Sequence, residues 1–568
     1  MTSDVLMSLP FPPALILILG APLMLIIGGW GRKALLLGLP LLTLAAIWQV
    51  PDGVQVTAAF LDYQLELVQG SNLSRLFATI FAIMAFAGGL FAMNQSRTIE
   101  LVAAFAYAGS AIGVALAGDL FTVFVFWELM AVGSTLVVWA AHTEESKRAA
   151  MRYALIHLLG GVIFMVGLVA YAQETGSIDF VAMQANSFAT WMLLAGFLIN
   201  TGAPPLSAWL PDAYPEASWS GTVFLSAFTT KTAVYVLLVG FAGTQALIWI
   251  GLYMIFYGIV YALLENDMRR ILAYSIVNQV GFMLVGAGIG TEMAINGAAA
   301  HAFTHIIYKA LLLMSAGSVM YMTDGKRKCT DLGGLFQSMP LTALAGIIGA
   351  LAISSFPLTS GFVSKSMTNQ AAYDMELMFV WMCLLAASAG VFLHAGIKFP
   401  WFVFFQKDSG LRPKDPPWNM KAAMVLFSFL CIWLGVQPGP LYAMLPFPTA
   451  YEPYTSAHVF EMLQLLLYSG LAFFVMLGLM KRTLTITLDF DWLYRKLLFG
   501  VAERSGNAIA KFLGAFTAIK NILVSGVISI ATEHHNPRGI LARTTPAGVM
   551  AFWVVMVLAA YLVIYLFI

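Results

Sequence analysis

The sequence predicts an all-α polytopic membrane protein, and three observations support this fold class. Of the 568 residues, 60% are hydrophobic and only 10% carry a charge. Apolar runs recur along the chain and reach the ~20 residues that a helix needs to cross a bilayer, a length that favours helices over the strands of a membrane barrel. The net charge is only +1, so the composition indicates no nucleic-acid partner.

Hydrophobic windows predict about 14 to 16 transmembrane helices. The first window has no basic residues before it and no clear cleavage site, so we interpret it as a retained helix rather than a signal peptide. Residues 50–72 alternate like a short extracytoplasmic β-hairpin. The predicted windows are 13–30, 34–48, 74–94, 98–118, 119–141, 152–173, 186–209, 219–241, 244–264, 270–289, 292–321, 340–370, 378–405, 420–437, 459–480 and 547–568.

Basic residues follow the odd-numbered windows and are almost absent after the even-numbered ones. This pattern predicts that the odd loops are cytoplasmic and that both chain termini lie outside. Residues 483–545 mix apolar with basic positions, which predicts an amphipathic helix along the membrane surface. Two shorter surface helices with a bend near Gly506 or Gly514 are the alternative. A last span follows this region.

Prolines interrupt two of the predicted spans. The first stretch reads LINTGAPPLSAWLPD, with Pro204 and Pro205, and the second reads ISSFPLTSGFVSK, with Pro357 and Gly361. Proline removes a backbone donor and breaks the helical ladder, so the freed carbonyls need protein or water as partners. Two such breaks predict repeated halves with discontinuous helices along a transport path. Two ordinary kinks are the alternative.

Glu128 lies near the middle of a predicted span, in the stretch FTVFVFWELMAVG. Burying a charge at that depth costs roughly 3 kcal/mol or more, so such residues normally face a bundle interior or a hydrated path. They then serve as proton or ion relays. The alternative is a carboxylate that is neutral or paired and contributes only to helix packing.

Further ionisable residues fall inside predicted spans. Lys231 lies within 219–241, where snorkelling to an interface is the alternative explanation. His301, His305 and Lys309 follow each other at four-residue steps, which places them along one face of a helix where histidine can pass protons near neutral pH. A zinc pair is the rival interpretation, but the Glu of HExxH and a third carboxylate ligand are missing. We therefore expect no metal and no cofactor.

Two residues nearer the C-terminus extend this series. They are Lys365, just after the second proline break, and His394. Lys398 either joins them or marks the cytoplasmic end of its helix. We interpret ENDMRRILAYS, residues 265–275, as a charged loop. The residues that we expect to form a polar line for protons at mid-membrane depth are Glu128, Lys231, His301, His305, Lys309, Lys365 and His394.

Six motifs occur together and in order within residues 60–405. They are VFVFWELM, PLSAWLPDAYPEA, FTTKTAVYVLL, DMRRILAYSIVNQVGF, HAFTHIIYKALLLMSAGSV and FPLTSGFVSKS. With these motifs the chain resembles the antiporter-like subunits shared by respiratory complex I, membrane-bound hydrogenases and Mrp-type cation/proton antiporters, in particular the D-type subunits of bacterial Mrp antiporters. The resemblance implies two inverted five-helix repeats with broken helices. It also implies that Glu128 and Lys231 belong to one proton half-path, and that His301, His305, Lys309 and Lys365 belong to the connection and the second half.

One position departs from the family pattern. Where the family usually has a lysine that partners the Glu of the fifth span, this chain has Asn200. Ser207 and Tyr214 likewise stand where histidines are often found. Because a neutral amide cannot stabilise the Glu128 carboxylate as a lysine would, we expect the first half-path to work differently or to be weakened.

These features predict a transporter subunit that is not itself an enzyme. We expect it to move protons in a multisubunit cation (Na+)/proton antiporter of a bacterial inner membrane, with other hydrophobic subunits as partners. Three alternatives stay open: the proton-pumping subunit of a complex I-like or hydrogenase complex, an energy-coupling subunit for inorganic-carbon uptake, and a scaffold whose charges only pair. The predicted segments are 1–97 (N-terminal helices and hairpin), 98–243 and 244–405 (the two antiporter-like repeats), 406–482 (flanking helices), 483–545 (lateral helix) and 546–568 (last span).

Overall fold

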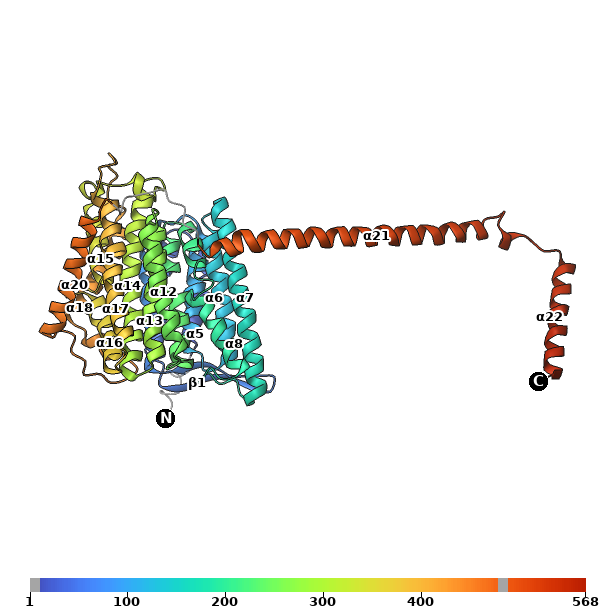
Figure 1. Ribbon diagram of the computed structural model, residues 1–568, viewed down its shortest axis with the longest axis horizontal. Coiled ribbons are helices and arrows are strands. Elements are labelled where there is room, and N and C mark those ends of the chain that lie inside the picture. Colours follow the sequence, from blue (N-terminus) through green and yellow to red (C-terminus); the bar gives the residue numbers. More distant parts are fainter. Residues whose placement is uncertain (1–10, 479–488, 568) are drawn as a thin grey trace. The chain divides into compact units, whose positions relative to one another are not determined.

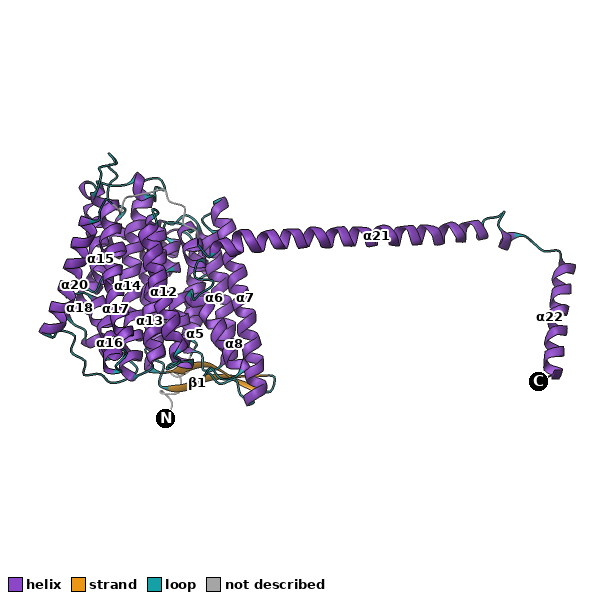
Figure 2. Cartoon of the chain, in the orientation of Figure 1, coloured by secondary structure: helices purple, strands orange, loops and turns teal. Residues whose placement is uncertain are grey.

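The computed structural model describes residues 11–478 and 489–567, and the chain divides into two compact units, one up to Asp491 and one from Trp492 on. The first unit is a bundle whose long helices stand side by side (Figure 1), and almost all of its regular structure is helical (Figure 2). The described residues contain 14 helices long and apolar enough to cross a membrane, with three shorter apolar helices at 13–26, 188–201 and 340–353. The predicted polytopic all-α class is confirmed.

The helices of the first unit keep the predicted order. In chain order they are α1 (Pro13–Gly20), α2 (Leu23–Ile26), α3 (Gly29–Ile47), α4 (Asn72–Phe91), α5 (Thr98–Leu116), α6 (Leu120–Trp139), α7 (Glu144–Thr175), α8 (Phe188–Thr201), α9 (Trp209–Ala213), α10 (Gly221–Leu225), α11 (Thr229–Gly240), α12 (Ala246–Leu264), α13 (Met268–Ile289), α14 (Glu292–Met322), α15 (Pro340–Ile353), α16 (Ser360–Asp374), α17 (Met378–Val391), α18 (Trp418–Val436), α19 (Gly439–Tyr442) and α20 (Ser456–Val475). Helix α17 continues through two wider π-helical segments, η5 (Phe392–Lys398) and η6 (Trp401–Phe405).

The predicted hairpin is present. Strand β1 (Gly53–Phe60) pairs antiparallel with β2 (Tyr63–Gly70), from Gly53 opposite Gly70 to Phe60 opposite Tyr63. The hairpin lies at one end of the bundle (Figure 2). Its β2 strand is anchored there by the Asp119 carboxylate, which accepts from the Glu66 backbone N–H at 2.7 Å and also caps α6.

The centre of the bundle is formed by α13 and α14. Every side chain from residue 271 to residue 288 on α13 is buried, and so is every one from residue 296 to residue 319 on α14. A helix that is buried all round belongs inside a bundle rather than at its rim. The ends of these two helices are fixed by side-chain caps from Asp267 and Thr291. The predicted ionisable row on α14 therefore lies in the core.

Two interruptions lie near the first proline stretch. Helix α8 ends at Thr201 and the short α9 begins at Trp209, so Pro204 and Pro205 lie in the irregular segment between two helices. A further discontinuity, which we call the first break, falls in the next span, between α10 and α11 at residues 226–228, where the sequence has no proline. Sequence patterns did not predict this break because the helix is opened by packing and by side-chain hydrogen bonds rather than by a missing backbone donor.

The second break is where Pro357 predicts it. Helix α15 ends at Ile353 and α16 starts at Ser360, with Pro357 between them. Gly361 permits this close packing, because a Cβ at that position would overlap the Ala352 carbonyl oxygen. The predicted single span 340–370 is thus a pair of half-helices.

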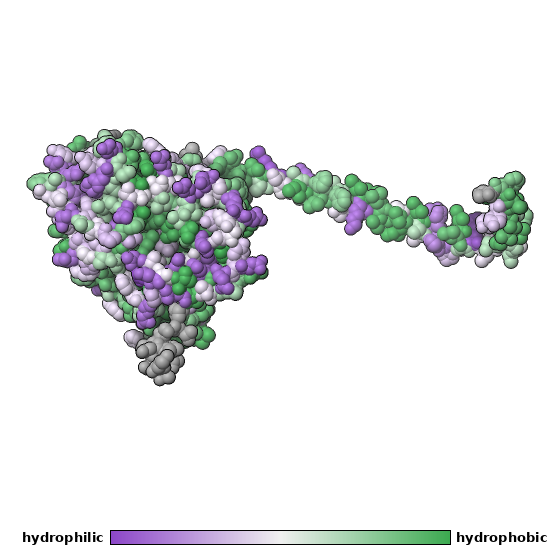
Figure 3. Space-filling view, turned by 90° about the horizontal axis from the view of Figure 1, so that it is seen from below, coloured by the Kyte–Doolittle hydropathy of each residue, from purple (hydrophilic) through white to green (hydrophobic). Residues whose placement is uncertain are grey.

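The second unit consists of a π-helical turn η7 (Leu493–Leu498) followed by α21 (Phe499–His535) and α22 (Ala547–Phe567). Helix α21 runs without interruption through Gly506 and Gly514, so the alternative of two shorter helices is wrong. Apolar side chains cover much of α21 and α22, with polar ones at intervals (Figure 3). Residues 483–488 of the predicted surface region lie outside the described residues.

Candidate functional site

A buried lysine stands at the break between α10 and α11. The chain leaves the helical path at Ser226 and resumes it at Thr229, so carbonyl oxygens at the break lack helical partners. The Lys231 side chain is fully buried, and its Nζ donates to the Ser226 carbonyl oxygen at 2.6 Å and to Thr230 Oγ1 at 3.1 Å. Since the ammonium points into the bundle, the snorkelling alternative does not hold for this residue.

The second break is arranged in the same way. Lys365, in the second turn of α16, donates its Nζ to the Ile353 carbonyl oxygen at the end of α15, at 2.6 Å. Its side chain is 2% exposed and lies 5.7 Å from the ring centroid of Phe282. Each break therefore supplies a backbone carbonyl that binds a buried ammonium group.

The three ionisable side chains that follow each other on α14 are also buried inside the bundle. His301, His305 and Lys309 are fully buried, and the two imidazole centroids are 6.0 Å apart. Lys309 Nζ donates to Ser275 Oγ on α13 at 2.8 Å. Neither nitrogen of either imidazole has a hydrogen-bond partner among the described protein atoms. Both rings are thus held by packing, with their nitrogens open to accept or donate a proton.

His394 and Lys398, both on η5, have different surroundings. The Nδ1 of His394 lies 2.8 Å from the Gly390 carbonyl oxygen and therefore carries the hydrogen, which makes Nε2 the free proton acceptor. Lys398 donates to the carbonyl oxygens of Ala262, Leu263 and Glu265 at 2.6–3.1 Å. It caps the C-terminal end of α12, which is a structural role.

Electrostatic interactions connect these groups. His305 lies within electrostatic range of Lys231, Lys309 and Lys365, and His394 lies within range of Lys309 and Lys365. In residues 11–478 and 489–567 no ion pair links any of them to a carboxylate. The structure thus brings six of the predicted residues into one cluster, which we call the cationic cluster: Lys231, His301, His305, Lys309, Lys365 and His394.

Glu128 is not part of this cluster. It is half-buried on α6, and its Oε1 lies so close to α7 that a Cβ at Gly161 would overlap it. Within the described chain this oxygen has no hydrogen-bond partner. Residue 200, where the family usually has the lysine partner, is asparagine, and its amide oxygen faces His157 Nδ1 at 2.7 Å.

Polar side chains that the sequence analysis did not single out connect this region with the first break. Tyr153 donates to Ser134 Oγ at 3.0 Å and lies 3.3 Å from Thr229 Oγ1, while the Tyr107 hydroxyl is 2.6 Å from the same Thr229 oxygen. The His157 ring packs at a tilt against Tyr153, with ring centroids 4.0 Å apart. A signal was present: His157 is an ionisable residue inside a predicted span, as Glu128 is.

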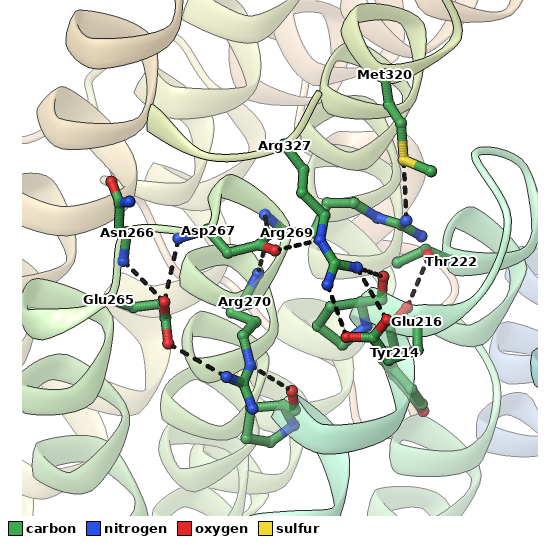
Figure 4. A network of polar contacts seen from close by, with 12 residues as sticks. Tyr214, Glu216, Thr222, Glu265, Asn266, Asp267, Arg269, Arg270, Met320 and Arg327 are labelled. Carbon is green, nitrogen blue, oxygen red and sulfur yellow. Dashed lines mark hydrogen bonds and ion pairs between the residues drawn. The ribbon is translucent and has the colours of Figure 1, made fainter. Parts of the chain in front are cut away.

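The stretch that we interpreted as a charged loop takes part in a largely enclosed ionic network (Figure 4). Arg327 pairs with Glu216 at 2.9 Å and with Asp267 at 2.8 Å, and Arg269 donates to two backbone carbonyls of the 217–218 turn. Burial raises the pKa of the Asp267 carboxyl, although the guanidinium groups of Arg327 and Arg269 oppose this rise. Residues 265–267 form the loop between α12 and α13, whereas residues 268–275 belong to α13. The sequence did not predict that tertiary packing would enclose these charges.

Another carboxylate beside this network also escaped the sequence analysis. Glu100, in the first turn of α5, is fully buried and accepts hydrogen bonds from the hydroxyls of Ser218 and Ser220 at 2.6 and 2.5 Å. Gln95 Nε2 adds a third at 3.2 Å. Several donors of this kind stabilise a buried carboxylate, so Glu100 links the start of α5 to the 218–220 turn.

Residues 117–390 match the protein-family model described as "NADH:quinone oxidoreductase/Mrp antiporter, TM". This part of the chain belongs to that family. The match contains Glu128 and all of the cationic cluster except His394. The matched residues thus correspond to the membrane-spanning part of that family, within a chain that has many helices long enough to cross a membrane.

Named relatives agree with this assignment. The chain is 30% identical over 392 residues to a probable K(+)/H(+) antiporter component of the A/B type from Rhizobium meliloti, in an alignment that covers 64% of this chain and 39% of that relative. It is 29% identical over 358 residues to the D-type component of the Na(+)/H(+) antiporter of Alkalihalophilus pseudofirmus, covering 58% of this chain and 69% of that relative. This chain thus spans well under half the length of the first relative.

A solved structure shares the fold. A chain of the Mrp complex from Dietzia sp. DQ12-45-1b superimposes with a TM-score of 0.68, covering 81% of this chain and 100% of that chain. The sequence identity over this superposition is 20%, so the likeness concerns the fold alone.

Proposed function

We propose that this chain is the proton-translocating subunit of a multisubunit cation/proton antiporter. Protons would move along Glu128 and the cationic cluster. The observation that carries the proposal is the cationic cluster itself, a set of buried amines and imidazoles held between broken helices without ion-paired carboxylates in the described chain. Ionisable groups inside a membrane bundle normally mark a path for protons or ions.

Repulsion inside the cluster favours proton movement. The His301 and His305 rings are 6.0 Å apart. Two unit charges at about 6 Å repel each other by roughly 3 kcal/mol at an effective dielectric constant of about 20. The cluster therefore holds few protons at once, and the arrival of one at Lys231 favours the departure of another toward Lys365. A relay requires this coupling between neighbouring sites.

The comparisons support an antiporter assembly as the setting. One relative is named as part of an Na(+)/H(+) antiporter and another as part of a probable K(+)/H(+) antiporter, and the solved fold neighbour is a chain of an Mrp complex. We infer other hydrophobic subunits as partners, a monovalent cation such as Na+ as the exchanged ion, and a bacterial inner membrane as the location. The second candidate is the proton-pumping subunit of a redox complex, because the family description covers both types.

Proton flux through the intact complex tests the proposal. The complex is purified in mild detergent, its companion subunits are identified by mass spectrometry, and it is reconstituted in vesicles with a pH-sensitive dye. We expect Glu128→Gln to lower the cation-dependent proton flux at least about tenfold, as the loss of a proton-carrying group does. The matched control Glu174→Gln removes an exposed carboxylate at the end of α7 and leaves the flux unchanged.

Two outcomes would contradict the antiporter proposal. Unchanged flux in Glu128→Gln would mean that the buried charges serve a scaffold. Companion subunits that carry iron–sulfur clusters, together with flux that follows electron transfer instead of a cation gradient, would assign the chain to a redox-driven pump.

A further inference from the structure

Three unpartnered polar atoms come together beside one turn of α7. They are Oε1 of Glu128 on α6, Nε2 of His157 on α7 and Nδ2 of Asn200 on α8, and none has a hydrogen-bond partner among the described protein atoms. His157 and Asn200 are each 1% exposed. Buried polar groups in folded proteins almost always have partners, so three exceptions from three adjacent helices need a reason.

A pair of glycines brings these groups against α7. A Cβ at Gly161 would overlap Glu128 Oε1, and a Cβ at Gly160 would lie 3.7 Å from Asn200 Oδ1. His157 precedes Gly161 by four residues, so the two positions lie on the same face of α7, with about 6 Å of helix rise between their backbones. The Glu128 carboxylate that lies against Gly161 and the imidazole of His157 are therefore on one side of this helix.

Asn200 determines which nitrogen of His157 takes up a proton. The amide oxygen of Asn200 is an acceptor and lies 2.7 Å from His157 Nδ1, so Nδ1 must carry the hydrogen. The lone pair of the neutral ring is then on Nε2, the nitrogen without a partner.

A row of hydroxyl groups continues from His157 toward the first break. The His157 ring packs at a tilt against Tyr153, with centroids 4.0 Å apart, and the Tyr153 hydroxyl lies 3.3 Å from Thr229 Oγ1. Thr229 is the first residue of α11, and the next residue, Thr230, accepts from Lys231 Nζ at 3.1 Å. Polar side chains thus lead from His157 to the start of α11, one residue before the threonine that Lys231 contacts.

We propose that His157, oriented by Asn200, carries protons between Glu128 and Lys231 in the first half-path. In the transfer, the O–H bond of the Glu128 carboxylic acid breaks and an N–H bond forms at His157 Nε2, leaving a carboxylate and an imidazolium. The imidazolium then gives up that proton through the hydroxyl row to the neutral Lys231 amine, which becomes an ammonium. The Nδ1–H bond to Asn200 is kept throughout. This inference rests on the function proposed above and supplies the residue that takes the place of the missing lysine.

The test combines a loss with a rescue in the reconstituted complex. We expect His157→Asn and His157→Gln to lower proton flux at least tenfold while the amount of assembled complex stays the same. Adding Asn200→Lys to His157→Asn places an amine beside Glu128, and we expect it to restore at least a third of the flux. The control His142→Asn replaces an exposed histidine at a left-handed backbone position that asparagine tolerates.

Infrared difference spectroscopy with isotope-labelled histidine provides a signal that a structural role would not produce. An imidazolium band should appear when a proton gradient is applied to the wild-type complex, and the part of it that comes from His157 should be lost in His157→Gln. If His157→Asn and His157→Gln assemble and keep wild-type flux while Glu128→Gln loses it, the proposed function stands and this inference fails. If flux is lost but the band is unaffected and Asn200→Lys rescues nothing, His157 is only a packing residue.

Discussion

The two helix breaks share a lysine–carbonyl hydrogen bond but differ in the side chains that surround it. At each break a buried lysine donates to a backbone carbonyl oxygen at 2.6 Å, Lys231 to Ser226 and Lys365 to Ile353. Around the first break the neighbours are hydroxyls, including those of Tyr153 and Thr229. Around the second, the Phe282 ring lies against both Lys365 and His301 of α14, with its centroid 5.7 Å from Lys365 Nζ and 5.5 Å from the imidazole centroid.

This difference shows how one arrangement can serve two parts of a path. A hydroxyl both donates and accepts, so a row of hydroxyls conducts a proton without storing it. An imidazole can hold a proton near neutral pH and therefore stores it between transfers. We infer that the first break passes protons from the Glu128 side and that the second break exchanges them with the histidine row.

The largest effect is expected at the lysines themselves. Lys231→Met and Lys365→Met each remove the titratable amine but keep much of the side-chain volume, so we expect each to lower proton flux about 100-fold. The measurement is dye-reported flux in vesicles, with assembly checked by gel filtration. Lys398→Met is the comparison, since that lysine only caps α12. Strong loss at one break with normal flux at the other would mean that the two breaks do not belong to one path.

An intermediate effect on stability is expected at the second break only. A Cβ at Gly361 would collide with the Ala352 carbonyl oxygen, whereas one at Gly221 beside the first break would meet Val137 at 3.1 Å. We expect Gly361→Ala to cost about 2 kcal/mol, as overpacking against backbone does, and Gly221→Ala to cost much less. Thermal unfolding of the detergent-solubilised protein measures both. Equal melting temperatures for the two variants would show that the α15–α16 contact can relax.

The smallest effect is expected from single hydroxyls. Tyr153→Phe keeps the ring packed against His157 but deletes the hydroxyl that faces Thr229, so we expect flux to fall about threefold, in the range of one lost hydrogen bond. Thr304→Val removes the 2.8 Å contact with Ser364 near the second break and should change flux less, because stored protons there sit on imidazoles. The reverse order would contradict the division of roles between the breaks.

Sequence patterns predicted the features that depend on local chemistry. Pro357 marked the second break because a residue without an N–H cannot continue a helix. The four-residue spacing of His301, His305 and Lys309 predicted a shared face, and the structure buries all three. No pattern in the sequence predicted the break at residues 226–228, since that opening depends on contacts such as the one between Tyr107 and Thr229, 122 positions apart.

By itself, the sequence determined that this chain forms membrane-spanning helices and which ionisable residues lie within them, because hydrophobic length and helical period are local properties. Only the tertiary structure decided which of these residues meet. It grouped six of them around α14, enclosed the charges of residues 265–270 in an ionic network, and set His157 against Asn200 beside Glu128. Such contacts join positions far apart in the chain, and no periodicity in a single sequence encodes them.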